Sequence, residues 1–268
     1  MKTHQKLCDG KFSVEMEVTG KGEPLLFLHG AGGLTGADPF LEDLGRNFKV
    51  YAPHLPGYGE STGGEHIDDV IDAALFYHEL MDELKIPSAN IVGHSMGGML
   101  AAEVAALDTR RAKKLVLVGA AGLWLDNDPI PDLFSADLDD LPAMLFHDPK
   151  SPLAQMMIAM PWDDQELLTA MYVERTRRFS AASKFLWPIP DRGLKKRAYR
   201  ITAPTLITFG RRDLVTSTRF SDRLTSGICN SEVLVFEGCA HAPLYENVEE
   251  FNEKTLQFLQ RQAGDGIG

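Results

Sequence analysis

Short apolar runs alternate with amphipathic segments along most of this chain, and this alternation restricts its fold more than any other feature. The run 24–28 has the apolar character and length of a strand, and the uninterrupted run 115–118 is typical of a strand buried on both faces. Residues 68–84 place their apolar side chains broadly on one stripe at helical spacing. Because strands that alternate with helices build a mainly parallel sheet covered by helices, the sequence predicts an α/β fold.

Other segments fit the same scheme. Residues 12–18 alternate between apolar and polar side chains, as in a strand with one face in water. The remaining predicted strands are 48–52, 90–92, 205–209 and 232–236, and the remaining predicted helices are 99–107 and 246–262.

Residues 123–204 interrupt the alternation. No strand–helix unit is visible there, eight prolines between 129 and 190 divide the segment into short predicted helices, and it holds five of the ten methionines and all three tryptophans. A long insertion between strands is usually a lid or a binding element. We therefore expect a core domain of residues 1–122 and 205–268 and a helical cap of residues 123–204. A helical pair that packs on its own core would also account for many of these side chains.

A G-x-S-x-G sequence centred on Ser95 lies between a predicted strand and a predicted helix. A tight strand-to-helix turn lifts a serine hydroxyl clear of the sheet, and small neighbours let strand and helix approach. The N–H of Met96 would lie at the N-terminus of the helix, where it can stabilise a developing oxyanion. The context therefore predicts a nucleophilic serine.

A serine nucleophile needs a base, and the base needs a carboxylate to orient it. His241 directly follows the last predicted strand, and Asp213 follows the strand before it; reactive groups gather at this edge of α/β sheets. The predicted triad is Ser95, Asp213 118 residues later, and His241 28 residues further. Asp126 is the alternative acid, and Asp213 could instead pair with an arginine at 211 or 212. Glu246 is interpreted as a charge at a helix N-terminus.

The glycine-rich segment 29–33 follows another strand. Glycines let the backbone approach a tetrahedral intermediate, so the N–H of Ala31 is the expected second oxyanion donor, with the N–H of Gly32 as the alternative. The methionines and tryptophans of the predicted cap favour an apolar acyl or aryl group. The predicted substrate-binding residues are Gly30, Gly32, His94, Trp124, Met144, Met160 and Trp187.

These motifs resemble those of the α/β-hydrolase superfamily over nearly the full length of the chain, from His29-Gly30 through 55–59 and the Ser95 turn to His241. Within it the chain is similar to small capped serine hydrolases, including bacterial esterases and hydrolases of meta-cleavage products. Departures are His54 where relatives usually carry Asp, Ala240 in place of Gly, and no Pro in 29–33. Serine at 95 also differs from the Asp of epoxide hydrolases and haloalkane dehalogenases.

The resemblance and the motifs together predict a serine hydrolase that cleaves carboxylic esters of small to medium acids through an acyl-enzyme. The alternative is a carbon–carbon bond hydrolase acting on a vinylogous diketone. Such an enzyme would need a cap arginine for its acidic substrate. The third hypothesis is a hydrolase-fold binding protein with weak catalysis. For the carbon–carbon bond hydrolase the candidate cap arginines are Arg175, Arg177, Arg178 and Arg192, each of which would equally suit a solvated helix face.

Composition limits the partners. A net charge of −11 disfavours nucleic acid and anionic membranes, and the longest apolar run has 11 residues, fewer than the ~18 of a membrane span. Three cysteines without a CxxC pair predict no metal site, and the triad needs no cofactor. The N-terminus lacks an apolar signal region, so we expect a cytoplasmic protein. The expected partner is a small-molecule substrate, and the sequence leaves undecided whether the protein forms a homodimer.

Overall fold

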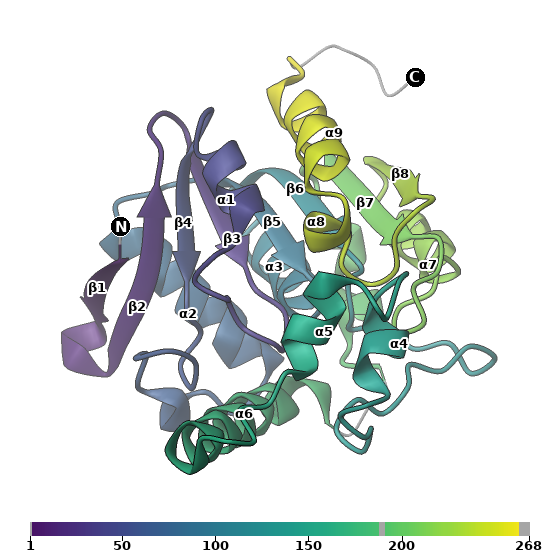
Figure 1. The fold of residues 1–268 in the computed structure, drawn as a ribbon. Helices are drawn as coiled ribbons and strands as arrows, with labels where there is room; N and C mark the ends of the chain where they lie inside the picture. The colour runs from purple at the N-terminus through teal and green to yellow at the C-terminus, as the bar shows by residue number, and fades with distance from the viewer. Residues whose placement is uncertain (1, 188–190, 263–268) are drawn as a thin grey trace.

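The computed structural model describes residues 2–187 and 191–262, without the side chain of Ile158. Within these ranges a central sheet has eight strands in the order β1-β2-β4-β3-β5-β6-β7-β8 (Figure 1). Strands β4, β3, β5, β6, β7 and β8 run parallel to one another, whereas β2 is antiparallel to both β1 and β4. The strands are β1 (Lys2–Leu7), β2 (Phe12–Thr19), β3 (Pro24–Leu28), β4 (Lys49–Pro53), β5 (Ala89–His94), β6 (Ala112–Val118), β7 (Thr205–Gly210) and β8 (Ser231–Phe236).

Helices cover both faces of the sheet. Leu26 and Leu28 of β3 join a core with α2 (Val70–Glu83), α3 (Met96–Leu107) and α7 (Phe220–Gly227). Leu25 and Phe27 join a second core with α1 (Pro39–Leu44), α8 (Pro243–Glu246) and α9 (Val248–Gln260). Successive side chains of a strand point to opposite faces, so each central strand contributes to both cores. The uninterrupted apolar runs in the sequence follow from this arrangement.

The insertion between β6 and β7 forms α4 (Leu141–Leu145), α5 (Pro152–Ile158) and α6 (Gln165–Leu186), which lie together at one end of the sheet (Figure 1). The first two helices are short, as the prolines predict. The expectation of short helices throughout is wrong for α6, which has 22 residues. The sequence contains no proline between 161 and 188, so nothing interrupts the backbone hydrogen bonds of this helix. The last part of the segment, including Leu194 and Ala198, packs into the core beside α3.

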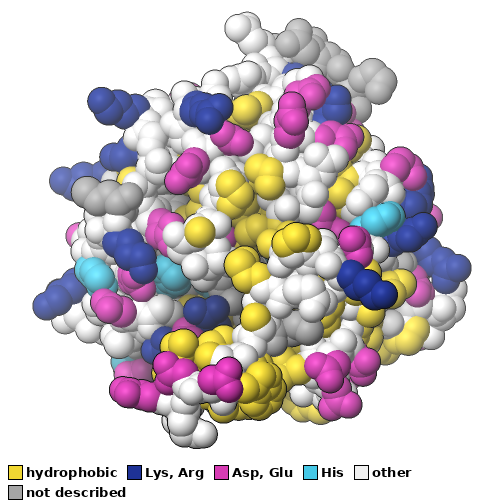
Figure 2. All heavy atoms as spheres, in the orientation of Figure 1, with side chains coloured by type: hydrophobic (Ala, Val, Ile, Leu, Met, Phe, Trp, Pro, Cys, Tyr) yellow, Lys and Arg dark blue, Asp and Glu magenta, His cyan; other side chains and the backbone are white. Residues whose placement is uncertain are grey.

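Apolar side chains of the insertion lie on the surface. Met156, Trp162 and Val173 are 64%, 69% and 63% exposed, and hydrophobic atoms gather over the lower part of the face in Figure 2. A helical pair packed on a core of its own does not account for these residues. Among the described residues, none of the helices combines the length and the apolar character needed to cross a membrane.

The predicted strand 24–28 coincides with β3, and the other predicted strands differ from the observed ones by a few residues at their ends. The helix predicted at 99–107 begins earlier, at Met96, so Gly97 and Gly98 are helical. Strand β1 and helices α1, α7 and α8 have no counterpart among the predicted segments.

Candidate active site

Ser95 occupies a strained turn between β5 and α3. Its φ of +54° and ψ of −115° lie where residues other than glycine are rarely found. The turn is held by neighbouring backbone groups, because Ser95 N donates to Val118 O at 2.8 Å and Ala121 N donates to Ser95 O at 3.1 Å. A side chain at Gly97 would overlap the carbonyl group of Leu28, so only glycine allows the helix to start this close to β3. The local structure is the sharp turn that the G-x-S-x-G sequence predicts.

Ser95, His241 and Asp213 form a continuous chain of hydrogen bonds. Ser95 Oγ lies 2.8 Å from His241 Nε2, and His241 Nδ1 lies 2.9 Å from Asp213 Oδ2. The three side chains follow β5, β8 and β7, and all three residues are buried. A carboxylate only accepts hydrogen bonds, so Nδ1 carries the imidazole proton and Nε2 is left to accept the serine hydroxyl. This tautomer allows the imidazole to take the serine proton.

The Asp213 carboxylate is fixed by three further donors. Its Oδ1 accepts hydrogen bonds from Val215 N and Thr216 N, both at 2.8 Å, and its Oδ2 accepts one from Thr216 Oγ1 at 3.0 Å. The alternative acid, Asp126, is exposed and accepts a hydrogen bond from Trp124 Nε1. Asp213 is therefore the carboxylate that reaches the imidazole. Thr216 was missed in the sequence, although a threonine three residues after an aspartate is a recognisable turn signal.

The glycine-rich loop after β3 lies beside Ser95. A Cβ atom built on Gly30 would lie 3.4 Å from Ser95 Cβ. The Gly30 carbonyl accepts hydrogen bonds from Gly33 N at 3.0 Å and His29 Nδ1 at 2.8 Å. In a trans peptide the N–H points opposite to the carbonyl. The N–H of Ala31 belongs to the same peptide as the Gly30 carbonyl, so it points away from Gly33 N and His29 Nδ1.

The next two carbonyls of this loop are also held by donors from other elements. Tyr58 Oη donates to Ala31 O at 3.0 Å, and Arg178 Nη1 of α6 donates to Gly32 O at 2.8 Å. Three successive peptide planes are therefore fixed, the first from within the loop and the next two by donors outside it. Such preorganisation is what a backbone oxyanion donor requires, because the donor must not reorient during the reaction. Tyr58 is not among the site residues predicted from the sequence, and Arg178 is predicted there only as a candidate arginine for an acidic substrate.

Two histidines beside the triad, the buried His29 and the partly buried His94, are neutral at neutral pH. Burial, together with the nearby His241, lowers the pKa of His94 to about 3, and burial lowers the pKa of His29 to about 4. His94 Nε2 donates to the main-chain carbonyl of His241 at 2.8 Å. His29 Nε2 accepts from Leu55 N at 3.1 Å, which assigns its proton to Nδ1. Both imidazoles therefore act as fixed hydrogen-bonding groups at neutral pH.

The other predicted substrate residues lie at varied places. Met144 and Met160 are half-buried in the insertion. Trp187 is 51% exposed, and its ring packs against Phe134 with centroids 6.3 Å apart. Trp124 lines a surface pocket with Asp191 and Lys195. Of the seven predicted substrate residues, Gly30 lies against the Ser95 turn and His94 contacts His241.

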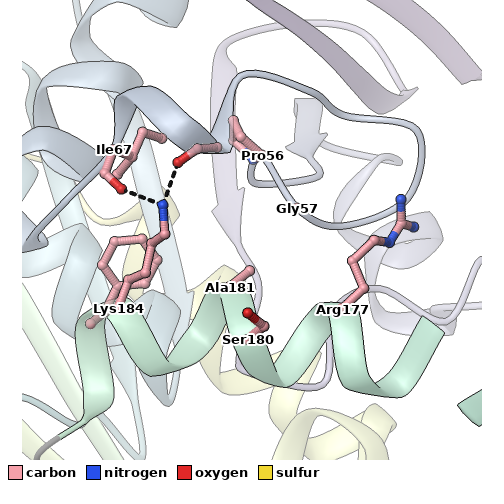
Figure 3. A pocket seen from close by; sticks show the side chains of 9 residues that line it. Pro56, Gly57, Ile67, Arg177, Ser180, Ala181 and Lys184 are labelled. Atoms are coloured by element: carbon pink, nitrogen blue, oxygen red, sulfur yellow. Dashed lines mark hydrogen bonds between the residues drawn. The ribbon is translucent and has the colours of Figure 1, made fainter. Parts of the chain in front are cut away.

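A cavity of about 220 Å³ lies between α6 and the loop that follows β4 (Figure 3). Lys184 Nζ crosses it to donate to Gly64 O at 2.6 Å and Ile67 O at 2.9 Å, and Arg177 Nη2 donates to Gly59 O at 2.6 Å. None of the triad residues lines this cavity. These cations therefore attach α6 to the core beside the candidate active site.

Comparisons with known proteins agree with this geometry. The family model described as the alpha/beta hydrolase fold matches residues 23–248. A 2-hydroxy-6-oxononadienedioate/2-hydroxy-6-oxononatrienedioate hydrolase of Comamonas testosteroni is 28% identical, covering 92% of this chain and 91% of its own. Lipase 3 of Moraxella sp. is also 28% identical, covering 85% of this chain and 75% of its own.

Solved structures show the same fold. The 2-hydroxy-6-oxo-6-phenylhexa-2,4-dienoate hydrolase of Rhodococcus sp. strain RHA1 superposes with a TM-score of 0.79 at 22% identity, covering 97% of this chain and 99% of its own. An esterase of Exiguobacterium antarcticum superposes with a TM-score of 0.78 at 22% identity, covering 97% and 100%. The family model, the named relatives and the sheet order together show that the chain is a hydrolase of the α/β-hydrolase fold family.

Proposed function

We propose that this protein is a serine hydrolase that cleaves carboxylic esters through an acyl-enzyme, with Ser95 as nucleophile, His241 as base and Asp213 as the orienting carboxylate. The single observation that supports this most is the hydrogen-bond chain in which Ser95 Oγ and Asp213 Oδ2 lie 2.8 Å and 2.9 Å from the two nitrogens of His241. A buried triad of this kind activates a hydroxyl that is otherwise a weak nucleophile at neutral pH.

In the proposed reaction Ser95 Oγ bonds to the substrate carbonyl carbon while its proton passes to His241 Nε2. The N–H groups of Met96 and Ala31 stabilise the resulting oxyanion. Collapse of the intermediate breaks the bond to the leaving alkoxide, which takes the proton from His241. Water then attacks the acyl-enzyme, gives its proton to His241, and releases the carboxylic acid as the proton returns to Ser95.

We further propose that residues 123–204 act as a cap over this site. The insertion contacts the candidate machinery directly, because Arg178 of α6 binds Gly32 O and the carbonyl of Leu145 accepts a hydrogen bond from His241 N at 3.1 Å. Its exposed and half-buried methionines and aromatic side chains favour apolar acyl or aryl groups, since methionine adapts to irregular shapes.

The test is turnover of a panel of aryl and alkyl esters of increasing acyl length by wild type and by Ser95→Ala. We expect Ser95→Ala to lose ester turnover and labelling by a fluorophosphonate while keeping the melting temperature of wild type. Ester turnover that survives the substitution would refute the mechanism. Labelling of wild type without turnover of any substrate would instead favour the binding-protein hypothesis.

Carbon–carbon bond hydrolysis is the second candidate function. Two observations favour it: several of the similar relatives are named as hydrolases of meta-cleavage products, and Arg178 is a cap arginine that reaches the loop beside Ser95. Its guanidinium also pairs with Glu174, with Nε 2.7 Å from Oε1. In this function Arg178 would hold the carboxylate of the substrate.

Arg178→Met separates the two functions. A carbon–carbon hydrolase should show a much larger KM for a dienoate substrate, whereas an esterase should show little change in KM for an uncharged ester. Arg175→Met is the matched control, because Arg175 lies on the same helix with its guanidinium 5.2 Å from the ring of Phe179. A dienoate that is not turned over by wild type would exclude the second function.

A further inference from the structure

The carboxylate of Glu246 lies between the candidate base and the insertion. Its Oε1 accepts hydrogen bonds from Ala240 N at 2.8 Å and Ala242 N at 3.2 Å, the two residues that flank His241. Its Oε2 accepts a hydrogen bond from His147 N at 2.6 Å. One side chain therefore binds the loop of the base with one oxygen and the segment after α4 with the other.

The main chain of His241 itself is held in the same region. Its N–H donates to Leu145 O at 3.1 Å, and its carbonyl accepts from His94 Nε2 at 2.8 Å. With Glu246 included, the three successive N–H groups of residues 240–242 all have partners. The backbone on both sides of the imidazole is thereby held by Glu246, Leu145 and His94. Leu145 belongs to the insertion, and Glu246 binds the insertion at His147.

We propose that Glu246 is a positioning residue, which holds His241 in line with Ser95 and couples the placement of the insertion to the placement of the base. This inference rests on the proposed function. It assigns a task to a residue that the sequence suggests is only a charge at a helix N-terminus. A carboxylate suits this role, because both of its oxygens accept hydrogen bonds and it can therefore bind three N–H groups at once.

Two substitutions of Glu246 remove part or all of its contacts with the His241 loop and with His147. Glu246→Gln keeps the shape of the side chain but has one accepting oxygen, so the amide NH₂ must face an N–H of either His147 or the His241 loop. Glu246→Ala removes all three hydrogen bonds. Glu249→Gln is the matched control, because Glu249 is an exposed glutamate in the first turn of α9.

We expect kcat for an aryl ester to fall about tenfold to a hundredfold in Glu246→Ala and by a smaller factor in Glu246→Gln, with KM little changed, because small displacements of catalytic groups have effects of this size. The apparent pKa in the profile of kcat/KM against pH should fall, since a displaced imidazolium loses its contact with Asp213. Glu249→Gln should behave as wild type in both measurements.

A double-substitution cycle distinguishes positioning from a general loss of structure. If Glu246 acts through His241, Glu246→Gln should not further lower the residual turnover of His241→Ala with an activated ester. A further loss in that background would indicate a structural role and overturn the inference. Should Glu246→Ala fail to fold, Glu246→Gln decides the matter: a kcat and pH profile equal to those of Glu249→Gln would also overturn it.

Ser95→Ala is measured alongside these variants. If Ser95→Ala turns over esters as wild type does, the proposed function fails. If Ser95→Ala is inactive while Glu246→Gln is unchanged, only the role of Glu246 fails.

Discussion

The imidazole of His94 donates a hydrogen bond from Nε2 to the main-chain carbonyl of His241 at 2.8 Å. The two rings lie 5.1 Å apart, centroid to centroid. The residue that precedes Ser95 in the chain therefore supports the backbone of the proposed base. Because burial lowers the pKa of His94 to about 3, this support is a neutral hydrogen bond over the working range of the proposed chemistry.

His94→Phe keeps an aromatic ring and removes the donor. We expect kcat for an ester to fall about tenfold, because His241 loses one attachment of its backbone and small displacements of a catalytic group are costly. His78→Phe is the control, since His78 Nε2 makes the same kind of hydrogen bond to Val104 O at 3.0 Å. That variant should lose stability without a change in kcat. Equal kcat values for the two variants would contradict the role of His94.

Asp213→Asn should lower kcat by about 10⁴, the size of effect seen when the acid of a serine triad becomes an amide. An amide cannot accept hydrogen bonds at both ends, so the contacts with His241, Val215 and Thr216 cannot all be kept. Asp126→Asn, at the exposed alternative acid, should leave kcat unchanged. Steady-state kinetics on both variants checks that Asp213 is the acid of the triad. A loss of kcat in Asp126→Asn and not in Asp213→Asn would assign that role to Asp126.

Tyr58→Phe removes the donor to Ala31 O and leaves a carbonyl of the candidate oxyanion loop without that hydrogen bond. An unsatisfied buried group costs about 1–3 kcal/mol, and a loop released in this way should lower kcat about tenfold without raising KM. Tyr77→Phe is the control, because the buried Tyr77 hydroxyl has no hydrogen-bond partner in the described structure. An unchanged kcat in Tyr58→Phe would argue against a role for this hydroxyl in the oxyanion site.

Stability should fall as the pH falls below about 6.5. Burial holds the pKa of His29 at about 4 and that of His94 at about 3, whereas both histidines bind protons near 6.5 when unfolded. Between pH 6.5 and these lower pKa values the unfolded state therefore binds more protons than the folded state. Each histidine then lowers the free energy of unfolding by about 1.4 kcal/mol for each pH unit by which the pH falls. Urea unfolding from pH 7 to 5 measures the slope. His94→Phe should show a shallower slope, and a free energy of unfolding that is constant over this range would contradict the prediction.

Much of the fold follows from local patterns in the sequence. The strand β3 begins and ends where the apolar run between Pro24 and Leu28 does, because a strand buried on both faces has no polar positions. The edge strand β1 is not predicted, since five of its six residues are polar and its order depends on pairing with β2. The long helix α6 is not predicted either, because the prolines on both sides of it indicate short helices throughout the insertion.

The sequence by itself determined which residue stands at the end of each strand, and so named Ser95, Asp213 and His241, because a parallel sheet brings such ends to one edge. The tertiary structure decided what holds these residues in place. His94 and His241 are 147 positions apart, and Glu246 meets His147 from 99 positions away. No periodicity encodes such contacts, since they depend on the order of strands in the sheet and on how the insertion lies across their ends.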